Sequence, residues 1–395
     1  MTRRKVAVVT VARSDYGSLR PVLHRLKTSP ALELQLIVGG AHLEAHLGNT
    51  EQAIKDDGHS FAATIPMNLV DDSPAGVARS AAMAHAGFAA AYASLEPDVL
   101  VLLGDRIETH AAAVAAVPFR LPVAHIHGGE LTLGAIDDCL RHSITKLAHL
   151  HFAATESYRD RILQMGEEAW RVVATGAPGV DAVLGVTPLK RGEIEARLNM
   201  KLSQDPLLVT FHPATLEKIS ATDQVNGLLS ALAIFDRPII ISGPNADTGS
   251  VEIRTVLQRF SSLRGHVRFV ENLDTPAYVG LMRTAAAMVG NSSSGVIEAP
   301  SFGLPVVNIG GRQAGRVRGE NVIDVSYDVG AIEAGIRRAL DSGFRRRLAS
   351  AANPYGDGHA AERIVAALEH CDPRERLLHK QFQDIKSSGP LRLTG

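Results

Sequence analysis

The feature that most constrains the fold is an alternation of short, continuously apolar runs with longer amphipathic segments along most of the chain. Runs such as 99–103 and 286–289 contain no polar residue, so each is expected to be a strand that is covered on both faces. Such strands, separated by helices, predict parallel sheets with helices on both sides. The strand candidates are 5–11, 34–38, 98–103, 121–126, 150–154, 171–174, 207–211, 238–242, 266–270, 286–290 and 305–308.

Amphipathic segments that predict helices fill the gaps, for example 76–95, 107–117, 223–235 and 331–341. Eleven strands exceed one comfortable doubly wound sheet, so we expect two sheets. The length of 395 residues agrees with this, because a domain usually contains about 150 residues. The mixed, charged stretch 182–205 is expected to connect the two domains.

Composition and charge exclude several classes of function. The chain has 41 Lys and Arg against 42 Asp and Glu, so it lacks the positive excess that is typical of nucleic-acid binders. Its two cysteines, Cys139 and Cys371, are too few for a disulfide framework or a Cys-rich zinc site, which favours the reducing cytoplasm. No segment approaches the ~18 apolar residues that span a membrane. The run 6–12 follows three basic residues, but Arg13 comes directly after it, so we expect a buried strand rather than a signal peptide.

Polar and small residues gather where predicted strands end, which is where ligands bind in open parallel sheets. Arg13 follows strand 5–11, and its guanidinium can bind a phosphate or simply cap the loop. Asp105 follows strand 98–103, where a carboxylate can be a general base, a metal ligand or a helix N-cap. Neither segment contains the G-x-G-x-x-G fingerprint, so a dinucleotide cofactor loses its main support.

The densest cluster of chemically active residues is the string His-Ile-His-Gly-Gly-Glu at 125–130, followed closely by further acids, histidines and an arginine. Strand alternation predicts that His125 and His127 lie on the same side, and the two glycines allow a sharp turn. Such clustering indicates an active site. Metal binding by the two histidines competes with metal-free proton transfer by carboxylates. The further residues of the cluster are Asp137, Asp138, Arg141, His142, His149 and His151.

The second half of the chain contains two such segments. His212 ends strand 207–211 and either lies at the mouth of the second sheet or is a loop histidine without a role. The string Gly-Asn-Ser-Ser-Ser-Gly at 290–295 leads into a helix, where amides and hydroxyls can bind a phosphate or form a Ser-rich N-cap. It lacks the lysine of a P-loop. Glu298 can accept two ribose hydroxyls, and Arg312 can add a phosphate contact.

Taken together and in order, these motifs resemble the UDP-N-acetylglucosamine 2-epimerase family, most of all its hydrolysing branch, which feeds sialic- and legionaminic-acid synthesis. The resemblance runs from Arg-Ser-Asp-Tyr at 13–16, through the strings at 104–106, 125–130 and 290–295, to Tyr-Gly-Asp-Gly at 355–358. It covers nearly the whole chain and is more specific than any single motif.

The resemblance implies an α/β fold of GT-B architecture, with two Rossmann-like doubly wound parallel-sheet domains facing a central cleft. The N-terminal domain would contain 1–187, with a C-terminal helix 365–386 packing back on it, and the nucleotide-binding domain would contain 188–364. The implied reaction converts UDP-N-acetylglucosamine and water to N-acetylmannosamine and UDP through a glycal. It uses no cofactor and no metal. A cytoplasmic homodimer or homotetramer that binds neither nucleic acid nor membrane is also implied.

The resemblance also assigns site residues by position. The implied catalytic residues are Asp105, His127, Glu130, Asp137 and His212. Many members of the family have a glutamate at the position of His127, so the role of this residue stays open. The implied substrate- and nucleotide-binding residues are Arg13, Arg106, Asn245, Leu273, Ser292, Ser293, Ser294, Gly295, Glu298 and Arg312.

The residue types fit this chemistry, because elimination needs a base and an acid near the sugar and donors on the departing diphosphate. Several alternatives remain open. The same reaction can take GDP-N-acetylglucosamine or a UDP-diacetamido-trideoxyhexose, and a non-hydrolysing 2-epimerase or a GT-B glycosyltransferase would share the nucleotide site. Two further alternatives are a metal-dependent hydrolase built on His125 and His127, and a nucleotide-sugar sensor without turnover.

Overall fold

The structure, a computed structural model, describes residues 3–44, 50–71, 73–133, 137–213, 219–244 and 250–384. Contacts between residues divide the chain into two compact units. Unit 1 contains residues 1–130, 139–176 and 361–395, and unit 2 contains residues 131–138 and 177–360.

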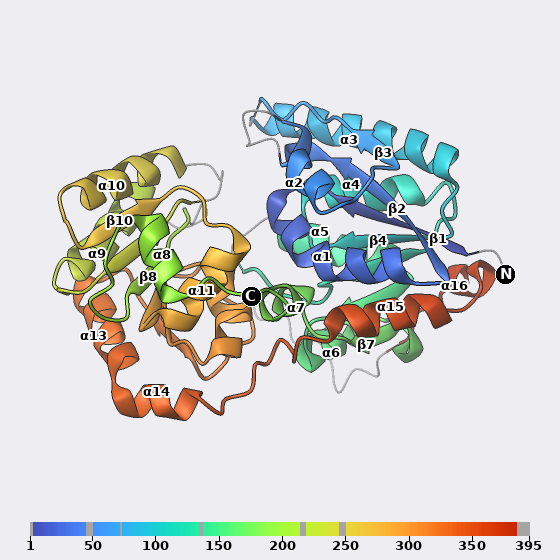
Figure 1. Ribbon diagram of the computed structural model, residues 1–395. Helices are drawn as coiled ribbons and strands as arrows, with labels where there is room; N and C mark the ends of the chain where they lie inside the picture. Colours follow the sequence, from blue (N-terminus) through green and yellow to red (C-terminus); the bar gives the residue numbers. More distant parts are fainter. Residues whose placement is uncertain are drawn as a thin grey trace, which may run out of the picture. The chain divides into compact units, whose positions relative to one another are not determined.

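Unit 1 is built on a parallel sheet with the strand order β3-β2-β1-β4-β5-β6-β7 (Figure 1). The chain winds outward in both directions from β1 and β4, so the junction of these two strands is the switch point of a doubly wound sheet. The strands are β1 (Arg4–Thr10), β2 (Leu32–Gly39), β3 (Ala63–Ile65), β4 (Val99–Leu103), β5 (Val123–Ile126), β6 (Leu150–Ala153) and β7 (Val172–Ala174).

Apolar helices cover both faces of this sheet, as the continuously apolar strands predict. One core contains α1, α2, α15 and α16, and it packs side chains such as Leu23 and Leu368 against Val6 and Val8. The core on the other face contains α3, α4 and α5, with Phe88 among its buried residues. The helices of unit 1 are α1 (Arg13–Thr28), α2 (Glu51–Asp56), α3 (Pro74–Leu95), α4 (Ile107–Ala116), α5 (Asp137–Leu147), α6 (Glu156–Gln164), α15 (Ala360–His370) and α16 (Arg374–Leu378).

Unit 2 repeats the same winding in a second parallel sheet, with the order β10-β9-β8-β11-β12-β13. Its switch point lies between β8 and β11, where Gly290 pairs with Thr210. The strands are β8 (Leu207–Thr210), β9 (Ile239–Ser242), β10 (Val267–Val270), β11 (Ala287–Gly290), β12 (Val306–Ile309) and β13 (Val322–Val325).

Two cores also enclose the sheet of unit 2. One contains side chains of α9, α10, α13 and α14, and the other contains side chains of α7, α8 and α11. The helices are α7 (Pro178–Leu184), α8 (Arg191–Leu198), α9 (Ala221–Leu232), α10 (Ser250–Ser262), α11 (Thr275–Thr284), α12 (Ser293–Ile297), α13 (Val329–Leu340) and α14 (Ser342–Leu348). The predicted class, a pair of Rossmann-like doubly wound parallel-sheet domains of GT-B type, is confirmed.

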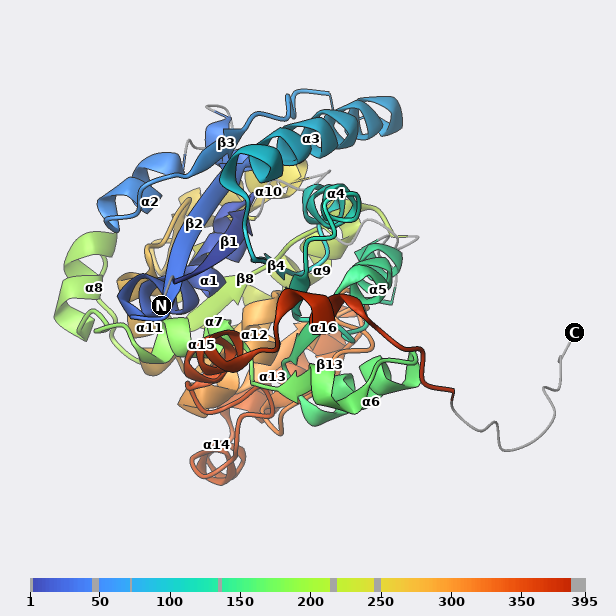
Figure 2. The same cartoon turned by 90° about the vertical axis from the view of Figure 1, so that its right-hand side faces the viewer.

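The C-terminal part of the chain differs in detail from the single helix predicted over 365–386. The structure has two helices, α15 and α16, interrupted by residues 371–373 and followed by an extended segment (Figure 2). Pro373 lacks an amide hydrogen and disfavours helix in the residue before it, which explains the break. Leu368 of α15 and Leu377 of α16 are buried in the core of unit 1.

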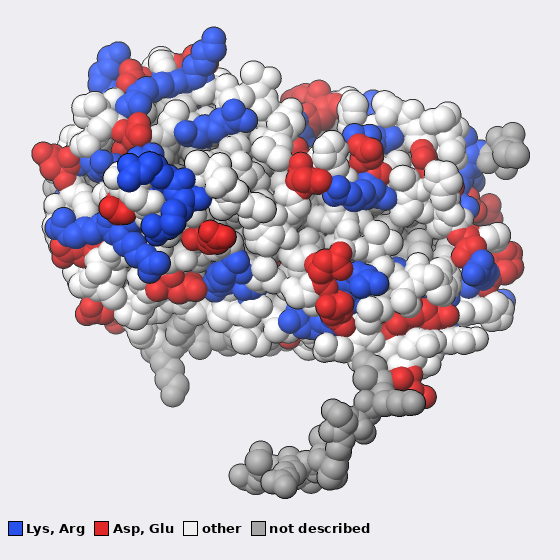
Figure 3. Space-filling model, turned by 90° about the horizontal axis from the view of Figure 1, so that it is seen from below, with Lys and Arg blue, Asp and Glu red and all other residues white. Residues whose placement is uncertain are grey.

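Charge is distributed unevenly on unit 2. Figure 3 shows Lys and Arg side chains gathered on the face that contains α14, with acidic side chains between them. The last turns of α13 and α14 supply Arg337, Arg338, Arg345, Arg346 and Arg347. Cations are favoured at helix C-termini, where backbone carbonyls have no partner within the helix.

Among the described residues, we find no helix long and apolar enough to cross a bilayer.

Candidate active site

In both units, several predicted site residues follow the carboxyl ends of the two strands at the switch point and of the next strand along the sheet. In unit 1, Arg13 follows β1, Asp105 follows β4, and His127 and Glu130 follow β5. In unit 2, His212 follows β8 and Ser292 follows β11, with Arg312 after β12. In doubly wound sheets, ligands bind outside the carboxyl ends of the strands near the switch point.

Arg141 connects the candidate residues of unit 1. It lies on α5, and its side chain is only 2% exposed. Its Nη2 atom donates to the Asp105 carboxylate, and its Nη1 atom donates to the Glu130 carbonyl oxygen at 3.0 Å. A buried guanidinium needs such partners, because leaving it uncompensated costs several kcal/mol. Asp105 itself is 22% exposed, so its carboxylate is fixed in position and still reaches solvent.

His127 and Glu130 form a second pair. The φ angle of His127 is +68°, a left-handed conformation that few residues other than glycine adopt, and it turns the chain out of β5. A Cβ atom on Gly129 would lie 2.4 Å from the Tyr158 carbonyl oxygen, so only glycine fits this tight turn. The turn brings the Glu130 carboxylate into contact with Nδ1 of His127. The Glu130 side chain is 3% exposed and the His127 side chain 13% exposed.

His125 is a structural residue in this arrangement. It is fully buried, and Nε2 lies 2.8 Å from the Gly104 carbonyl oxygen. Burial lowers the pKa of His125 to about 3, so the imidazole is neutral and donates through Nε2. His125 and His127 therefore have separate partners, because the left-handed backbone of His127 ends the strand alternation. Within the ranges that the structure describes, no three His, Cys, Asp or Glu side chains are grouped to hold a metal ion.

Three other predicted residues of this region lie near helix starts. Arg13 is the exposed first residue of α1. Arg106 is the N-cap of α4, and Nη2 lies 3.3 Å from Oε1 of Glu108. Asp137 is the half-buried first residue of α5. It lies in the segment 131–138, which belongs to unit 2.

A reciprocal pair joins the two central strand ends of unit 2. The His212 amide donates to Oδ1 of Asn291 at 2.7 Å, and Nδ2 of Asn291 donates to the His212 carbonyl oxygen at 2.8 Å. Burial, together with the nearby Arg312 charge, lowers the pKa of His212 to about 3, so this imidazole is neutral. Its neutral ring can donate one hydrogen bond without adding a charge.

The serine turn and Arg312 lie around the same asparagine. Oγ of Ser292 accepts from the Ser294 amide at 3.4 Å, which makes Ser292 the N-cap of α12. Nη1 of Arg312 lies 3.4 Å from the Asn291 carbonyl oxygen, and Nε2 of Gln313 donates to that oxygen at 2.9 Å. The structure thus brings the predicted phosphate donors of unit 2 into one group.

The remaining predicted residues of unit 2 differ in exposure. Glu298 is the half-buried C-cap of α12. Burial of Tyr278, together with the negative charge of Glu298, raises the pKa of Tyr278 to about 12. Gly295 is buried against Val306. The Leu273 side chain is buried in the core. Asn245 lies outside the described residues.

Two important residues are absent from the predicted site set, namely Arg141 and Asn291. Both occur inside the motifs that revealed the site, but their roles depend on burial and on partners that are distant in the sequence. Besides its place in the dense cluster, Arg141 lies four residues after Asp137, a helical spacing that places both on one face of α5.

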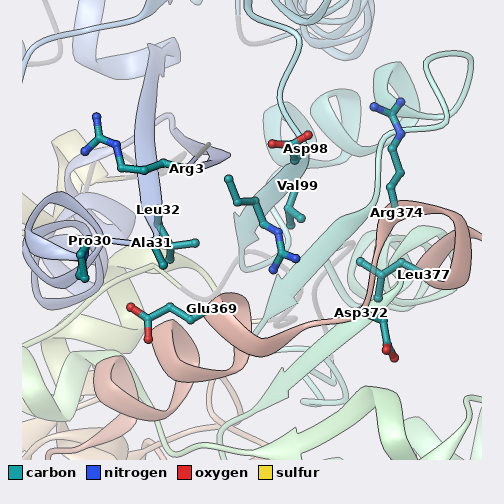
Figure 4. A pocket seen from close by; sticks show the side chains of 11 residues that line it. Arg3, Pro30, Ala31, Leu32, Asp98, Val99, Glu369, Asp372, Arg374 and Leu377 are labelled. Carbon is teal, nitrogen blue, oxygen red and sulfur yellow. The ribbon is translucent and has the colours of Figure 1, made fainter. Parts of the chain in front are cut away.

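A pocket of about 780 Å³ lies at the opposite edge of the sheet of unit 1, at the amino ends of β1, β2 and β4 (Figure 4). It is lined by residues such as Leu32, Asp98, Glu369 and Arg374 and contains none of the predicted site residues. Arg374 already donates to the carbonyl oxygens of Phe119 and Arg120. This pocket marks where the C-terminal helices dock on the sheet.

Comparison with known proteins finds sequence matches over most of the chain. The family model described as UDP-N-acetylglucosamine 2-epimerase matches residues 24–369. The UDP-N,N'-diacetylbacillosamine 2-epimerase (hydrolyzing) of Legionella pneumophila is 38% identical, over 95% of this chain and 98% of that protein. The GDP/UDP-N,N'-diacetylbacillosamine 2-epimerase (hydrolyzing) of Campylobacter jejuni is 35% identical, over 98% and 100% of the two chains.

A solved structure also shares the fold. The UDP-GlcNAc 2-epimerase from Neisseria meningitidis, determined with UDP-GlcNAc bound, aligns with a TM-score of 0.80 at 20% identity, over 92% of this chain and 99% of that one. The motifs, the two doubly wound sheets and the extended sequence matches agree. This chain belongs to the UDP-N-acetylglucosamine 2-epimerase family.

Proposed function

We propose that this protein is a hydrolysing 2-epimerase of a UDP-activated 2-acetamido sugar, with Asp105, Glu130 and Asp137 in acid–base roles. The observation that carries the proposal is the fixed position of Asp105, which a buried arginine holds at the switch point while part of the carboxylate stays open to solvent. A general base needs this combination of fixed geometry and access to substrate.

The proposed reaction starts with abstraction of the proton on C2 of the sugar. As that proton leaves, a double bond forms between C1 and C2, the bond from C1 to the UDP oxygen breaks, and UDP takes the electron pair. Water then adds its hydroxyl to C1, and an acid delivers a proton to C2 from the opposite face. The products are UDP and the free 2-epimer, and each positioned acid or base contributes about 10²-fold to 10⁴-fold in rate.

The group in unit 2 is proposed to bind the departing UDP. Arg312 and the amides of the serine turn supply donors for the diphosphate, and Glu298 can accept hydrogen bonds from the ribose. The neutral His212 would donate to a phosphate oxygen as negative charge develops on it. Arg13, Arg106, Asn245 and the main chain of Leu273 complete the proposed binding set.

The sugar is proposed from the comparisons. The resemblance described above implies UDP-N-acetylglucosamine, with a UDP-diacetamido-trideoxyhexose as an alternative. The relatives that are 38% and 35% identical are named for diacetylbacillosamine nucleotides, which supports assaying UDP-N,N'-diacetylbacillosamine first and UDP-N-acetylglucosamine second. The name of the Campylobacter relative includes GDP, so the GDP forms belong in the same panel. We also propose that the chain is a homodimer or homotetramer.

Chromatography of the products tests the proposed function. Purified protein is incubated with each nucleotide sugar, and nucleoside diphosphate and free sugar are quantified. We expect equal amounts of UDP and free 2-epimer, with the same rate in EDTA. An epimerised UDP-sugar without UDP release would indicate the non-hydrolysing reaction. Loss of activity in EDTA that zinc restores would indicate a metal-dependent hydrolase, and UDP binding without turnover on the whole panel would indicate a sensor.

A further inference from the structure

The segment after α16 binds the end of the helix that carries Arg141. We call residues 379–384 the strap, and Figure 2 shows this part of the chain running past α5 towards α6. Nζ of Lys380 donates to the carbonyl oxygens of Lys146 at 2.9 Å and Ala148 at 2.8 Å, and lies 3.5 Å from that of Thr145. The last carbonyls of a helix have no partner within the helix, and a cation there is favourable. Lys380 therefore caps α5 from more than 230 residues away.

A buried glutamate holds this lysine in place. Oε2 of Glu167 lies 2.7 Å from Nζ of Lys380, and Oε1 lies 2.6 Å from Nζ of Lys146. Although burial alone would raise it, the pKa of Glu167 falls to about 2, because His151 and the two lysines donate hydrogen bonds to the carboxylate. The carboxylate is therefore ionised at neutral pH and binds both the strap and the last turn of α5.

The backbone of the strap is attached independently of this lysine. The Gln381 amide lies 3.2 Å from a Glu168 carboxylate oxygen, and the Gln383 amide donates to the Gly166 carbonyl oxygen at 2.9 Å. Gly166 has a φ angle of +85°, and a Cβ atom there would meet the Phe382 ring at 2.5 Å. The strap thus fits closely against the turn after α6, and its lysine reaches α5 from a fixed backbone.

From these contacts, and resting on the proposed function, we infer that Lys380 is a positioning residue for the Arg141–Asp105 pair. Thr145, whose carbonyl Lys380 approaches, donates from Oγ1 to the Arg141 carbonyl oxygen at 3.1 Å one turn earlier in α5. A cap on the last turn fixes the rotation and position of the helix, and so the direction of the Arg141 side chain. Misplacement of a reacting group by about 1 Å can cost about 100-fold in rate.

The test compares Lys380→Met with Lys380→Arg and a matched control in the full-length protein. Lys27→Met is the control, because Nζ of Lys27 also donates to a backbone carbonyl in unit 1, that of Gly58, far from α5 in sequence. For Lys380→Met we expect kcat to fall about 10-fold or more with KM changed less than about 3-fold. Arginine can donate to the same carbonyls, so Lys380→Arg should recover much of kcat, and Lys27→Met should match wild type.

Hydrogen exchange supplies a second measurement that needs no substrate. We expect Lys380→Met to raise amide exchange selectively in residues 141–148, and Lys380→Arg to raise it less. Unchanged exchange in α5, unchanged kcat, or a uniform rise across the whole chain would overturn the inference. If wild type turns over no sugar, the proposed function fails while the exchange data still decide whether Lys380 positions α5. If Lys380→Met does not fold, Lys380→Gln, which keeps two donors without the charge, repeats the comparison.

Discussion

Asp105 is the single residue on which the proposed chemistry depends most. Its position comes from one buried side chain, Arg141, which also binds the backbone at Glu130. One guanidinium therefore fixes a carboxylate after β4 and the turn after β5, although these residues are separated by 25 positions in the sequence. Such sharing is typical of active sites, where a supporting side chain sets the geometry of several groups.

Replacing Asp105 by Asn should abolish most turnover. The amide has nearly the same size but cannot accept a proton, so we expect kcat to fall about 10²-fold to 10⁴-fold while UDP still binds. Initial rates and UDP titration calorimetry measure the two effects. The control is Asp56→Asn, an exposed aspartate on α2. Turnover close to that of wild type would show that Asp105 is not a catalytic group.

Because His125 is buried and neutral, we expect the stability of the folded protein to depend on pH. Its pKa is about 3 in the folded protein and about 6.5 when exposed, so between these values the unfolded chain binds more protons. Stability from this residue is therefore present at neutral pH and is lost as the pH falls from about 6.5 to 3. At pH 5 the loss should be about 2 kcal/mol relative to pH 7.

Urea unfolding of wild type and His125→Gln at pH 7 and pH 5 measures this loss. The variant should lose less stability than wild type between the two pH values, whereas His24→Gln, at an exposed position on α1, should behave as wild type does. Equal losses in wild type and His125→Gln would contradict the buried, neutral state of His125.

At the scale of helices and strands, the glycine that ends β11 shows how closely the site is built. Gly290 has a φ angle of +143° and pairs with Thr210 of β8, and a Cβ atom there would lie 1.9 Å from the Thr210 carbonyl oxygen. A side chain would push apart the two strands that carry His212 and the serine turn. No rotamer change relieves a clash with backbone.

Gly290→Ala should therefore destabilise the protein by about 2 kcal/mol or more and weaken UDP binding. Thermal unfolding and UDP titration measure these effects. The matched control is Gly192→Ala in α8 of the same unit, where a Cβ atom meets nothing within 4 Å, so we expect no loss of stability. Full stability of Gly290→Ala would contradict the tight pairing described here.

The sequence predicts most elements because the strands are continuously apolar. All eleven predicted strands are present, whereas β3 and β13 escape prediction. β3 has three residues, and Asp324 interrupts the apolar run of β13. The alternation expected for His125 and His127 does not apply beyond Ile126, the last residue of β5, because His127 adopts a left-handed backbone, which no local pattern announces for a histidine. The role of Arg141 could not be predicted, since it depends on tertiary partners.

At the scale of the whole molecule, the proposed chemistry draws on residues of two compact units with the same winding. Unit 1 contains Asp105 and its arginine, and unit 2 contains the His212–Asn291 pair and the serine turn. The predicted domain limits, 1–187 with the C-terminal helix and 188–364, stay predictions. Two switch points in one chain allow sugar chemistry and nucleotide binding to depend on different residues.

Glu298→Ala tests this division of labour. Removing the carboxylate proposed to bind the ribose should raise the Kd for UDP by about 10-fold or more, since hydrogen bonds to a charged group contribute about 1.5–3 kcal/mol. At saturating substrate, kcat should change much less than in Asp105→Asn. The control is Glu333→Ala, an acidic residue on α13 that pairs with Arg337. Unchanged UDP affinity would refute the ribose contact.

The central claim is proton abstraction at C2 coupled to release of UDP. Proton NMR in D₂O with UDP-N,N'-diacetylbacillosamine, and then with UDP-N-acetylglucosamine, tests it most directly. We predict that UDP and the free 2-epimer appear together, with deuterium at C2 of every product molecule. A free sugar that keeps its original C2 proton and configuration would contradict the claim, because it would indicate simple hydrolysis without epimerisation.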